Sequence, residues 1–407
     1  MPGKFLSYGS IQATMRYMTV YTRSKLSRHC ASLRIFNSSL PIQISNLSFA
    51  RSSNDFSVDG TRYRLGIYRR LEGALEGPFY DAIHWHNARG GSPHEMDRFG
   101  IRVLHPDVVV SPGEIMIGRG CVCLDNDPEA DMMISIGLAN ILSGRDANQG
   151  AREEEEDQFP PYRFKRLNLL PPYRSFVQLT VTPANGGPEE VERVEYDGKG
   201  LAEANRYLFE KLFGGRTVNT KRLDLGDTEL VLRFPVGFKM QIRELKFVGS
   251  IPRVLTLIQP LLTNSDSLDS VEISFYFAHH IEFRHPMVRG AQKLIITSSY
   301  EKLDWFPILQ NFRNPKIRIS SAASWLTNLQ QMTLFKSWME RKPEIGTQLI
   351  FELKTTEELT SRDELSICSP IEGTFSSLDF SFRIHRRNEN ETTGTMRIEV
   401  VSNHIYA

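Results

Sequence analysis

Leu245-Lys246-Phe247 is the first of five short segments that decide the fold of this chain. Apolar and polar residues alternate in most of them, which is the period of a β-strand with one buried face. The first four begin at residues 245, 271, 294 and 317, so their starts are 26, 23 and 23 residues apart. This spacing falls within the roughly 20–29 residues of leucine-rich repeats. The other four segments are Val271-Glu272-Ile273, Leu294-Ile295-Ile296, Ile317-Arg318-Ile319 and residues 349–353.

Apolar stretches between these strands predict helices. They lie at residues 254–258 and 305–309, and a longer helix is expected over residues 324–341, ended by Pro343. A strand and a helix in each repeat would stack as a curved sheet backed by helices. The asparagine-containing leucine consensus is missing, so an ordinary α+β layer explains the same spacing equally well.

The middle of the chain predicts further strands and a helix. Residues 42–49, with a bulge near Asn46, and residues 62–68 have strand patterns, whereas residues 72–100 have the composition of a loop. A hairpin is expected from residues 176–182 and 191–196. Residues 201–212 carry a helical stripe that ends at Gly214-Gly215, and residues 223–225 and 230–232 predict a strand pair.

An acidic run, Glu153-Glu154-Glu155-Glu156-Asp157, marks a linker that cannot bury enough apolar area to order itself. The predicted organisation is therefore a helical segment (1–41), a β-rich region with long loops (42–142), an acidic linker (143–161), a hairpin and helix region (162–240) and a strand–helix array (241–407). The expected fold class is α+β.

The first forty residues contain two short apolar stripes at helical spacing. Ile11, Met15 and Met18 form the first stripe, and Leu26, Cys30 and Leu33 form the second. No acidic residue occurs before Asn54. A helix pair of this kind cannot bury its apolar faces alone, so it must dock on the rest of the chain or on a partner.

Composition excludes several classes of protein. The 407 residues carry a net charge of +1, so no excess charge attracts nucleic acid or membrane. Four cysteines favour a reducing compartment, and no apolar run approaches the roughly 18 residues of a membrane span. We expect a protein of the cytoplasm or nucleus. The basic, serine-containing N-terminus keeps open import into mitochondria, with an activity that is then unknown.

One group of residues that are close in the sequence has side chains of the kinds that bind metal ions: His84, His86, His94, Glu95, Asp97 and His105. Cys121-Val122-Cys123 is a ligand pair without a second pair, and no nucleophile or phosphate-binding motif is present. We therefore expect a binding protein rather than an enzyme, with no catalytic residue, metal or cofactor. The alternative is a metal-dependent enzyme that uses His84, His86 and Asp97.

Several motifs together resemble the nematode-expanded families of F-box-like proteins, in particular one with a long domain of unknown function. The motifs are residues 30–34 (CASLR), 63–68 (YRLGIY), 97–100 (DRFG), 171–182 (PPYRSFVQLTVT), 234–238 (FPVGF) and 338–347 (WMERKPEIGT).

The resemblance implies that the N-terminal helices bind a Skp-type adaptor of a cullin–RING ubiquitin ligase and that the C-terminal part holds an unknown protein substrate. The adaptor face would contain Ile11, Met15, Met18, Leu26 and Leu33. The chain departs from the family pattern at Leu6-Ser7, Gly9 and Ala31. A degenerate segment that no longer binds an adaptor therefore stays open.

Overall fold

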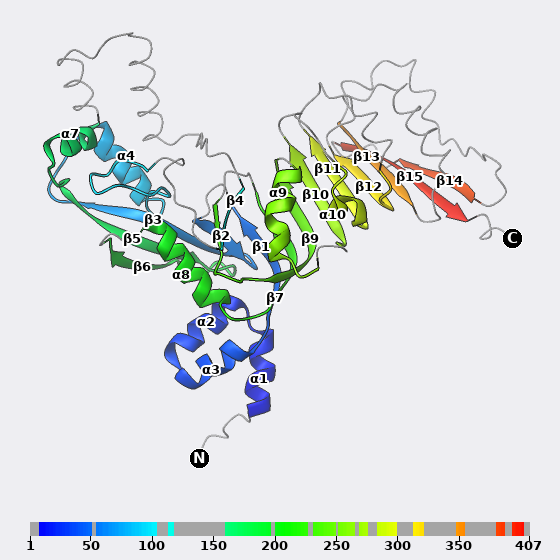
Figure 1. The fold of residues 1–407 in the computed structure, drawn as a ribbon, viewed down its shortest axis with the longest axis horizontal. Helices are drawn as coiled ribbons and strands as arrows, with labels where there is room; N and C mark the ends of the chain where they lie inside the picture. Colours follow the sequence, from blue (N-terminus) through cyan, green and yellow to red (C-terminus); the bar gives the residue numbers. More distant parts are fainter. Residues whose placement is uncertain are drawn as a thin grey trace, which may run out of the picture. The chain divides into compact units, whose positions relative to one another are not determined.

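The computed structural model describes residues 8–50, 54–103, 113–117, 159–196, 200–226, 231–249, 251–264, 268–275, 283–298, 312–320, 347–354, 380–386 and 393–402. The chain forms two compact units (Figure 1). Unit 1 comprises Met1–Asn219 and Glu229–Lys239, and unit 2 comprises Thr220–Thr228 and Met240–Ala407. Helices and a sheet occur in each unit, which confirms the predicted α+β class.

Unit 1 is built on an antiparallel sheet with the strand order β1-β2-β3-β5-β6. The strands of this unit are β1 (Ile42–Phe49), β2 (Asp55–Val58), β3 (Thr61–Leu71), β4 (Glu114–Met116), β5 (Tyr173–Thr182), β6 (Glu190–Glu195) and β8 (Val231–Arg233). Its helices are α1 (Tyr8–Tyr17), α2 (Val20–His29), α3 (Ala31–Ser39), α4 (Pro78–Asn87), α7 (Pro160–Leu167) and α8 (Leu201–Phe213).

The long strand β3 forms the middle of this sheet. It pairs with β5 from Arg62 opposite Thr182 to Leu71 opposite Tyr173. Its alternating residues Tyr63, Leu65 and Ile67 are buried, as the sequence pattern predicts. Between them, a Cβ atom at Gly66 would lie 2.4 Å from the carbonyl oxygen of Gly90, so only glycine lets the following turn pack on this strand. The predicted β5–β6 hairpin is also confirmed.

The predicted helix at residues 201–212 is confirmed as α8, which ends before Gly214. It carries Phe209 into an aromatic core beneath β1 and β2. The ring centroid of Phe209 lies 4.5 Å from that of Phe56, 5.9 Å from that of Phe49 and 5.3 Å from that of Phe234. These contacts place α8 against the sheet and stabilise unit 1 chiefly through aromatic burial.

The predicted irregularity near Asn46 is present in β1. Residues 42 and 44 are buried before it and residues 47 and 49 after it, so the alternation shifts by one residue. The Asp59 carboxylate accepts hydrogen bonds from the backbone N–H groups of Ser45 (2.7 Å) and Asn46 (3.0 Å). One carboxylate thus satisfies the two neighbouring donors at the point where the alternation shifts.

The expectation of a loop over residues 72–100 is wrong in its central part, because residues 78–87 form α4. Pro78 occupies the first turn of this helix, where a missing N–H costs no hydrogen bond. Phe79 and Ile83 are buried with Phe159 and Tyr173. The last two residues of the predicted linker, Pro160 and Pro161, begin α7.

The expected pairing of residues 223–225 with residues 230–232 is wrong. The strand β7 (Val218–Asp224) is followed by β8, but β8 pairs with the distant β4, through Glu114 opposite Arg233. Sequence proximity suggested a hairpin, whereas β8 pairs with a strand remote in the sequence and joins it through the buried ion pair of Glu114 and Arg233.

A buried charge cluster joins β4, β8 and α8. The Glu114 side chain is fully buried, and one of its carboxylate oxygens accepts hydrogen bonds from Arg206 (2.8 Å) and Arg233 (2.9 Å). The Arg233 side chain is 6% exposed and that of Arg206 is 37% exposed. The carboxylate therefore compensates a deeply buried guanidinium that has little access to water.

In unit 2 the strands stand side by side in the order β7-β9-β10-β11-β12-β13-β15-β14. After β7, its strands are β9 (Met240–Val248), β10 (Ser270–Phe275), β11 (Lys293–Ser298), β12 (Lys316–Ser320), β13 (Gln348–Lys354), β14 (Phe380–Arg386) and β15 (Thr393–Ser402). Its described helices are α9 (Ile251–Ile258), a short 3₁₀ turn (Gln259–Leu261) and α10 (Pro286–Gly290).

The five predicted C-terminal strands are confirmed as β9 to β13. Each is parallel to the next and lies beside it in chain order, and β13 then pairs antiparallel with β15. The helix predicted at residues 254–258 is confirmed as part of α9. The helices expected at residues 305–309 and 324–341 lie outside the described residues.

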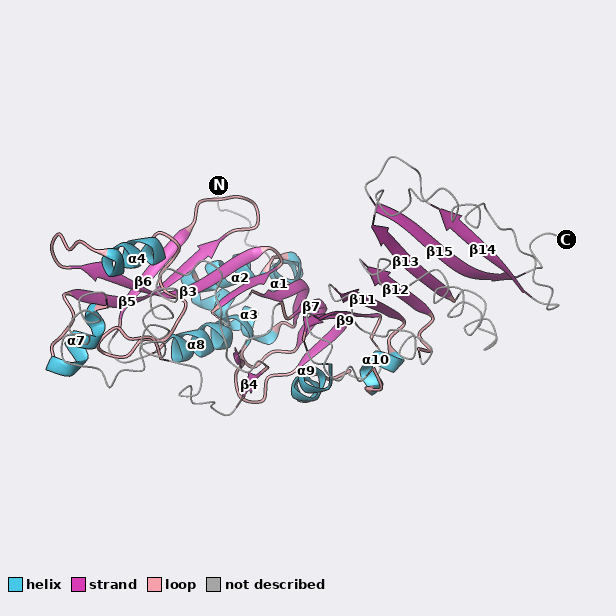
Figure 2. Ribbon diagram, turned by 90° about the horizontal axis from the view of Figure 1, so that it is seen from above, coloured by secondary structure: helices cyan, strands magenta, loops and turns pink. Residues whose placement is uncertain are grey.

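One face of the parallel sheet is apolar and carries the helices. Leu245, Val271, Leu294, Ile317 and Leu349 stand in one register row and are all buried. Figure 2 shows α9 and α10 on the same side of these strands. Backbone bonds also join successive turns, from Lys316 N–H to Gln292 O (3.2 Å) and from Gln348 N–H to Pro315 O (2.8 Å). Each turn is therefore fixed by the preceding one.

Candidate functional site

The N-terminal helical segment, which we define as α1, α2 and α3, consists of three helices rather than the predicted pair. Thr19 is the N-cap residue of α2, and its side-chain oxygen accepts a hydrogen bond from Thr22 N–H (3.2 Å). Cys30 has an extended backbone and separates α2 from α3. The second predicted stripe is therefore wrong as a single helical face, because Leu26 lies in α2 and Leu33 in α3.

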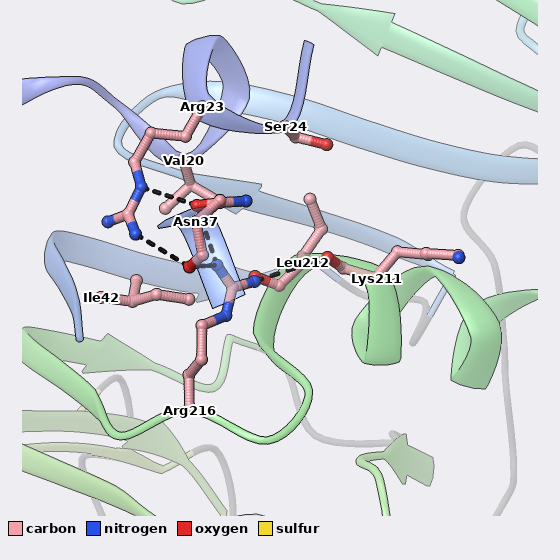
Figure 3. A pocket seen from close by; sticks show the side chains of 8 residues that line it. All are labelled: Val20, Arg23, Ser24, Asn37, Ile42, Lys211, Leu212 and Arg216. Atoms are coloured by element: carbon pink, nitrogen blue, oxygen red, sulfur yellow. Dashed lines mark hydrogen bonds between the residues drawn. The ribbon is translucent and has the colours of Figure 1, made fainter. Parts of the chain in front are cut away.

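Two arginines attach this segment to the rest of unit 1 through one asparagine, Asn37 (Figure 3). Arg23 of α2 donates through Nε to the side-chain oxygen of Asn37 (2.9 Å). Arg216, which follows α8, donates through Nη1 to the same oxygen (3.1 Å) and to the Asn37 carbonyl oxygen (3.1 Å). The amide of Asn37, which is 9% exposed, thus joins α2, α3 and the end of α8.

Among the described residues that line this cluster none is acidic, and carbonyl oxygens at helix ends supply compensating partial charge. Arg23 also donates to Pro41 O (3.2 Å) just beyond α3, and Arg216 donates to the carbonyl oxygens of Leu212 and Lys211 at the end of α8. Free carbonyls at a helix C-terminus carry partial negative charge. Burial lowers the pKa of Arg23, and burial together with the charge of Arg23 lowers the pKa of Arg216 to about 10.

The space among these residues is too small to be a ligand site. Its walls include Val20, Ile42 and Leu212 beside the two arginines, and they leave no room for a water molecule. The cluster is a structural joint between the helical segment and the sheet of unit 1.

A second attachment links α2 to the edge strand β6. Tyr21 donates its hydroxyl to Glu190 (2.7 Å), Lys25 forms an ion pair with Glu190, and Arg28 forms one with Glu192. The hydrogen bonds from Lys25 and Tyr21 hold the pKa of Glu190 below its ordinary value, and the bond to Glu190 raises the pKa of Tyr21. These contacts hold the basic helix α2 against the acidic edge strand β6.

Acid should weaken this attachment. Because the pKa of Glu190 is lowered in the folded protein, its contribution is present above the unfolded value and is lost as pH falls through the folded value, that is, from about pH 4.5 downward. We expect Glu190→Gln to be slightly less stable than the parent at pH 7, and the difference to shrink as the pH falls below about 4.5. Urea unfolding of both proteins at a series of acidic pH values measures it. A difference that does not change with pH would exclude the ionised carboxylate as its source.

The structure separates the five predicted adaptor-face residues. Met15 is only 2% exposed and belongs to the core. Ile11, Met18 and Leu33 are half-buried, and Leu26 is 36% exposed. Of the five, Leu26 is the most exposed.

Two exposed residues of the segment were missed by the sequence analysis. Tyr17 is 92% exposed and Ile35 is 72% exposed. Both lie beside a predicted stripe rather than on it, so helical spacing alone assigns them to the solvent side. Their apolar character was the available signal, because a basic solvent-facing surface rarely needs an aromatic ring and an isoleucine. The exposed cations Arg16, Arg28 and Arg34 lie close to these apolar residues in the sequence.

The structure gives the predicted metal ligands separate surroundings. On α4, His84 is exposed whereas His86 is buried. Glu95 accepts a hydrogen bond from Ala202 N–H (2.6 Å) in the first turn of α8, and Asp97 accepts bonds from Phe99 N–H and Ile101 N–H (2.9 Å each). The described residues contain no group of three His, Cys, Asp or Glu side chains that could hold a metal. His105, Cys121 and Cys123 lie outside them.

The second candidate surface is the polar face of the parallel sheet in unit 2, opposite the side that carries α9 and α10. We name it the open face. Its ion pairs connect the strands β7, β9 and β10: Arg222 with Glu272 (2.8 Å) and with Glu244 (3.9 Å), and Lys246 with Asp224 (3.2 Å) and with Glu272 (3.8 Å). The open face consists of Arg222, Asp224, Glu244, Lys246, Glu272, Lys293, Ile295, Lys316, Arg318, Gln348 and Ile350.

The alternating sequence pattern contains the signal for this surface, but only the parallel register shows which side chains meet. In the part of the chain that the structure describes, no helix is long and apolar enough to cross a membrane.

Comparison with known proteins adds one similarity. Neither a curated protein nor a solved structure matches this chain. Residues 200–355, from the start of α8 to just beyond β13, match the family model of a domain of unknown function (DUF3557).

Proposed function

We propose that this chain is a protein-binding adaptor, with its N-terminal helical segment bound to a Skp-type subunit of a cullin–RING ubiquitin ligase and unit 2 holding a protein substrate. The exposure of Tyr17, Leu26 and Ile35 on a rigidly attached, basic segment is the observation that carries this proposal. The segment acts in the cytoplasm or nucleus, where such ligases work.

The attachment of the segment supports a permanent role in the folded protein. Met15 and Val20 are buried, and Arg23 is joined to Asn37 and Arg216. Removal of these residues would uncover Ile42 and leave Arg216 without the Asn37 acceptor. This arrangement favours a docking module over a mitochondrial leader that is cut off after import.

The organisation of unit 2 supports the substrate-holding role. Five strands stand side by side in chain order, successive turns are bonded to one another, and the described helices lie on one side. Strand–helix arrays of the leucine-rich-repeat kind share this arrangement and use the opposite, curved strand face for binding. We infer that unit 2 is a short array of this type.

Polar substitutions on the exposed apolar residues should abolish adaptor binding. We expect the double variant Leu26→Asp and Ile35→Asp to lose at least about tenfold in recovery of a Skp-type subunit when the tagged full-length chain is purified from cells, because charged groups would be buried in the interface. Mass spectrometry of the co-purified proteins measures the recovery.

Two further variants make the experiment decisive. Leu170→Asp changes a leucine that is 82% exposed elsewhere in unit 1 and should leave recovery unchanged. Met15→Asp should lower the thermal stability of the whole unit, because Met15 is core. Failure of the parent chain to recover any Skp-type subunit would contradict the ligase role, and equal recovery by the parent and the double variant would place the interface elsewhere.

A further inference from the structure

The parallel sheet of unit 2 has an unusual second face. Parallel sheets are generally covered on both sides, and their strands are then apolar throughout. Here the residues of the outward-facing row are Lys246, Glu272, Ile295, Arg318 and Ile350, and all five are half-buried. A face of this composition is built for contact with water or with a polar partner, not for a second helical layer.

Charge is distributed unevenly across the open face. At the β7–β10 end, Asp224, Glu244 and Glu272 each form an ion pair with a basic side chain of the open face, either Arg222 or Lys246. The acidic groups of the described open face are therefore neutralised within that end. They supply no attraction for a basic partner.

At the β11–β12 end, two lysines stand directly side by side. Lys293 and Lys316 are register partners on adjacent parallel strands, and both lie on the open face. Neighbouring strands are about 4.8 Å apart, so the two lysines bring two positive charges to one small area of the sheet. Among the described acidic side chains, none forms an ion pair with either lysine. An anionic group placed between them would interact favourably with both charges.

The surroundings of the two lysines indicate a peptide. Ile295 and Ile350 flank Arg318 in the next row, and both are half-buried, so apolar contact is offered next to the positive charge. Nucleic acid binding depends on many phosphate contacts along a strongly basic surface. This chain has a net charge of +1 and a short basic cluster, which suits an acidic peptide better.

We propose that the open face of β11 and β12 binds an acidic peptide segment of the protein substrate, with its carboxylates between Lys293 and Lys316 and an apolar side chain against Ile295 and Ile350. This inference rests on the proposed substrate-holding role of unit 2 and names the substrate class. It does not depend on which subunit binds the N-terminal helical segment.

Selection from a random peptide library displayed on phage tests the proposal with the purified full-length chain. We expect enrichment of peptides in which Asp or Glu alternates with apolar residues. A synthetic peptide from the enriched set, labelled with fluorescein, then gives a dissociation constant by anisotropy. The double variant Lys293→Glu and Lys316→Glu should bind it about tenfold or more weakly, because repulsion replaces attraction.

Matched variants exclude a general charge effect. Arg163→Glu with Lys165→Glu changes the net charge by the same amount on α7, where both side chains are exposed, and should keep the parent affinity. Enrichment of basic or purely apolar peptides, no enrichment, or equal affinity of the parent and the Lys293/Lys316 variant would overturn the proposal. So would a single-stranded RNA oligonucleotide that displaces the peptide and binds more tightly at the same lysines. None of these outcomes alters the co-purification of a Skp-type subunit, so the two proposals fail separately.

Discussion

Replacement of Glu114 by alanine is expected to lower the free energy of unfolding by about 3–5 kcal/mol, the cost of removing one partner from a buried ion pair. The carboxylate is fully buried and accepts bonds from Arg206 and Arg233. Its removal leaves the deeply buried guanidinium of Arg233 facing another cation. Guanidinium chloride unfolding of the full-length chain measures the loss.

Two companion variants locate the source of this effect. Arg233→Met should be better tolerated than Glu114→Ala, because it removes a buried charge and leaves Glu114 paired with Arg206. Glu76→Ala removes an exposed carboxylate of unit 1 and should change the stability by less than about 0.5 kcal/mol. If Glu114→Ala proved as mild as Glu76→Ala, the cluster would be solvated in solution rather than buried.

Asn37→Leu is expected to cost about 2–4 kcal/mol, because two buried guanidinium groups lose a shared acceptor at once. Arg23 is 3% exposed, and the donors of both arginines point at the same amide oxygen. Leucine has the branched shape of asparagine and a larger volume, so no cavity contributes to the loss. Thermal unfolding followed by circular dichroism measures the change.

The matched variant Asn37→Asp should behave in the opposite way. A carboxylate between two guanidinium groups forms charge-assisted bonds, so we expect stability at pH 7 equal to or above that of the parent. The gain should disappear as pH falls through the lowered pKa of the new carboxyl group. Destabilisation by aspartate similar to that by leucine would show that the Arg23–Asn37–Arg216 joint does not hold the segment in place.

Local patterns were sufficient for the elements with one buried face. The alternation in residues 62–68, the spacing of the five C-terminal segments and the stripe on residues 201–212 each led to the correct element. Side chains in such elements meet the core at the element's own period, so the sequence displays the period directly.

Local patterns failed where a distant element decides the outcome. The helix α4 is hidden among glycine, histidine and proline residues, and its burial depends on Phe159 and Tyr173 far along the chain. The strand β8 pairs with β4 and not with β7, which precedes it in the sequence. An ion pair between Glu114 and Arg233 joins the two strands. No window of adjacent residues contains this information.

The candidate surfaces divide in the same way. Sequence alone determined that the N-terminus is helical, basic and partly apolar. It also determined that five strands repeat with one polar face. Both properties follow from the type and the spacing of the side chains. Only the tertiary structure decided that Met15 is core while Tyr17 and Ile35 are exposed, and that Lys293 lies beside Lys316. Exposure and like-charge proximity arise from packing between residues remote in sequence, and no local period encodes them.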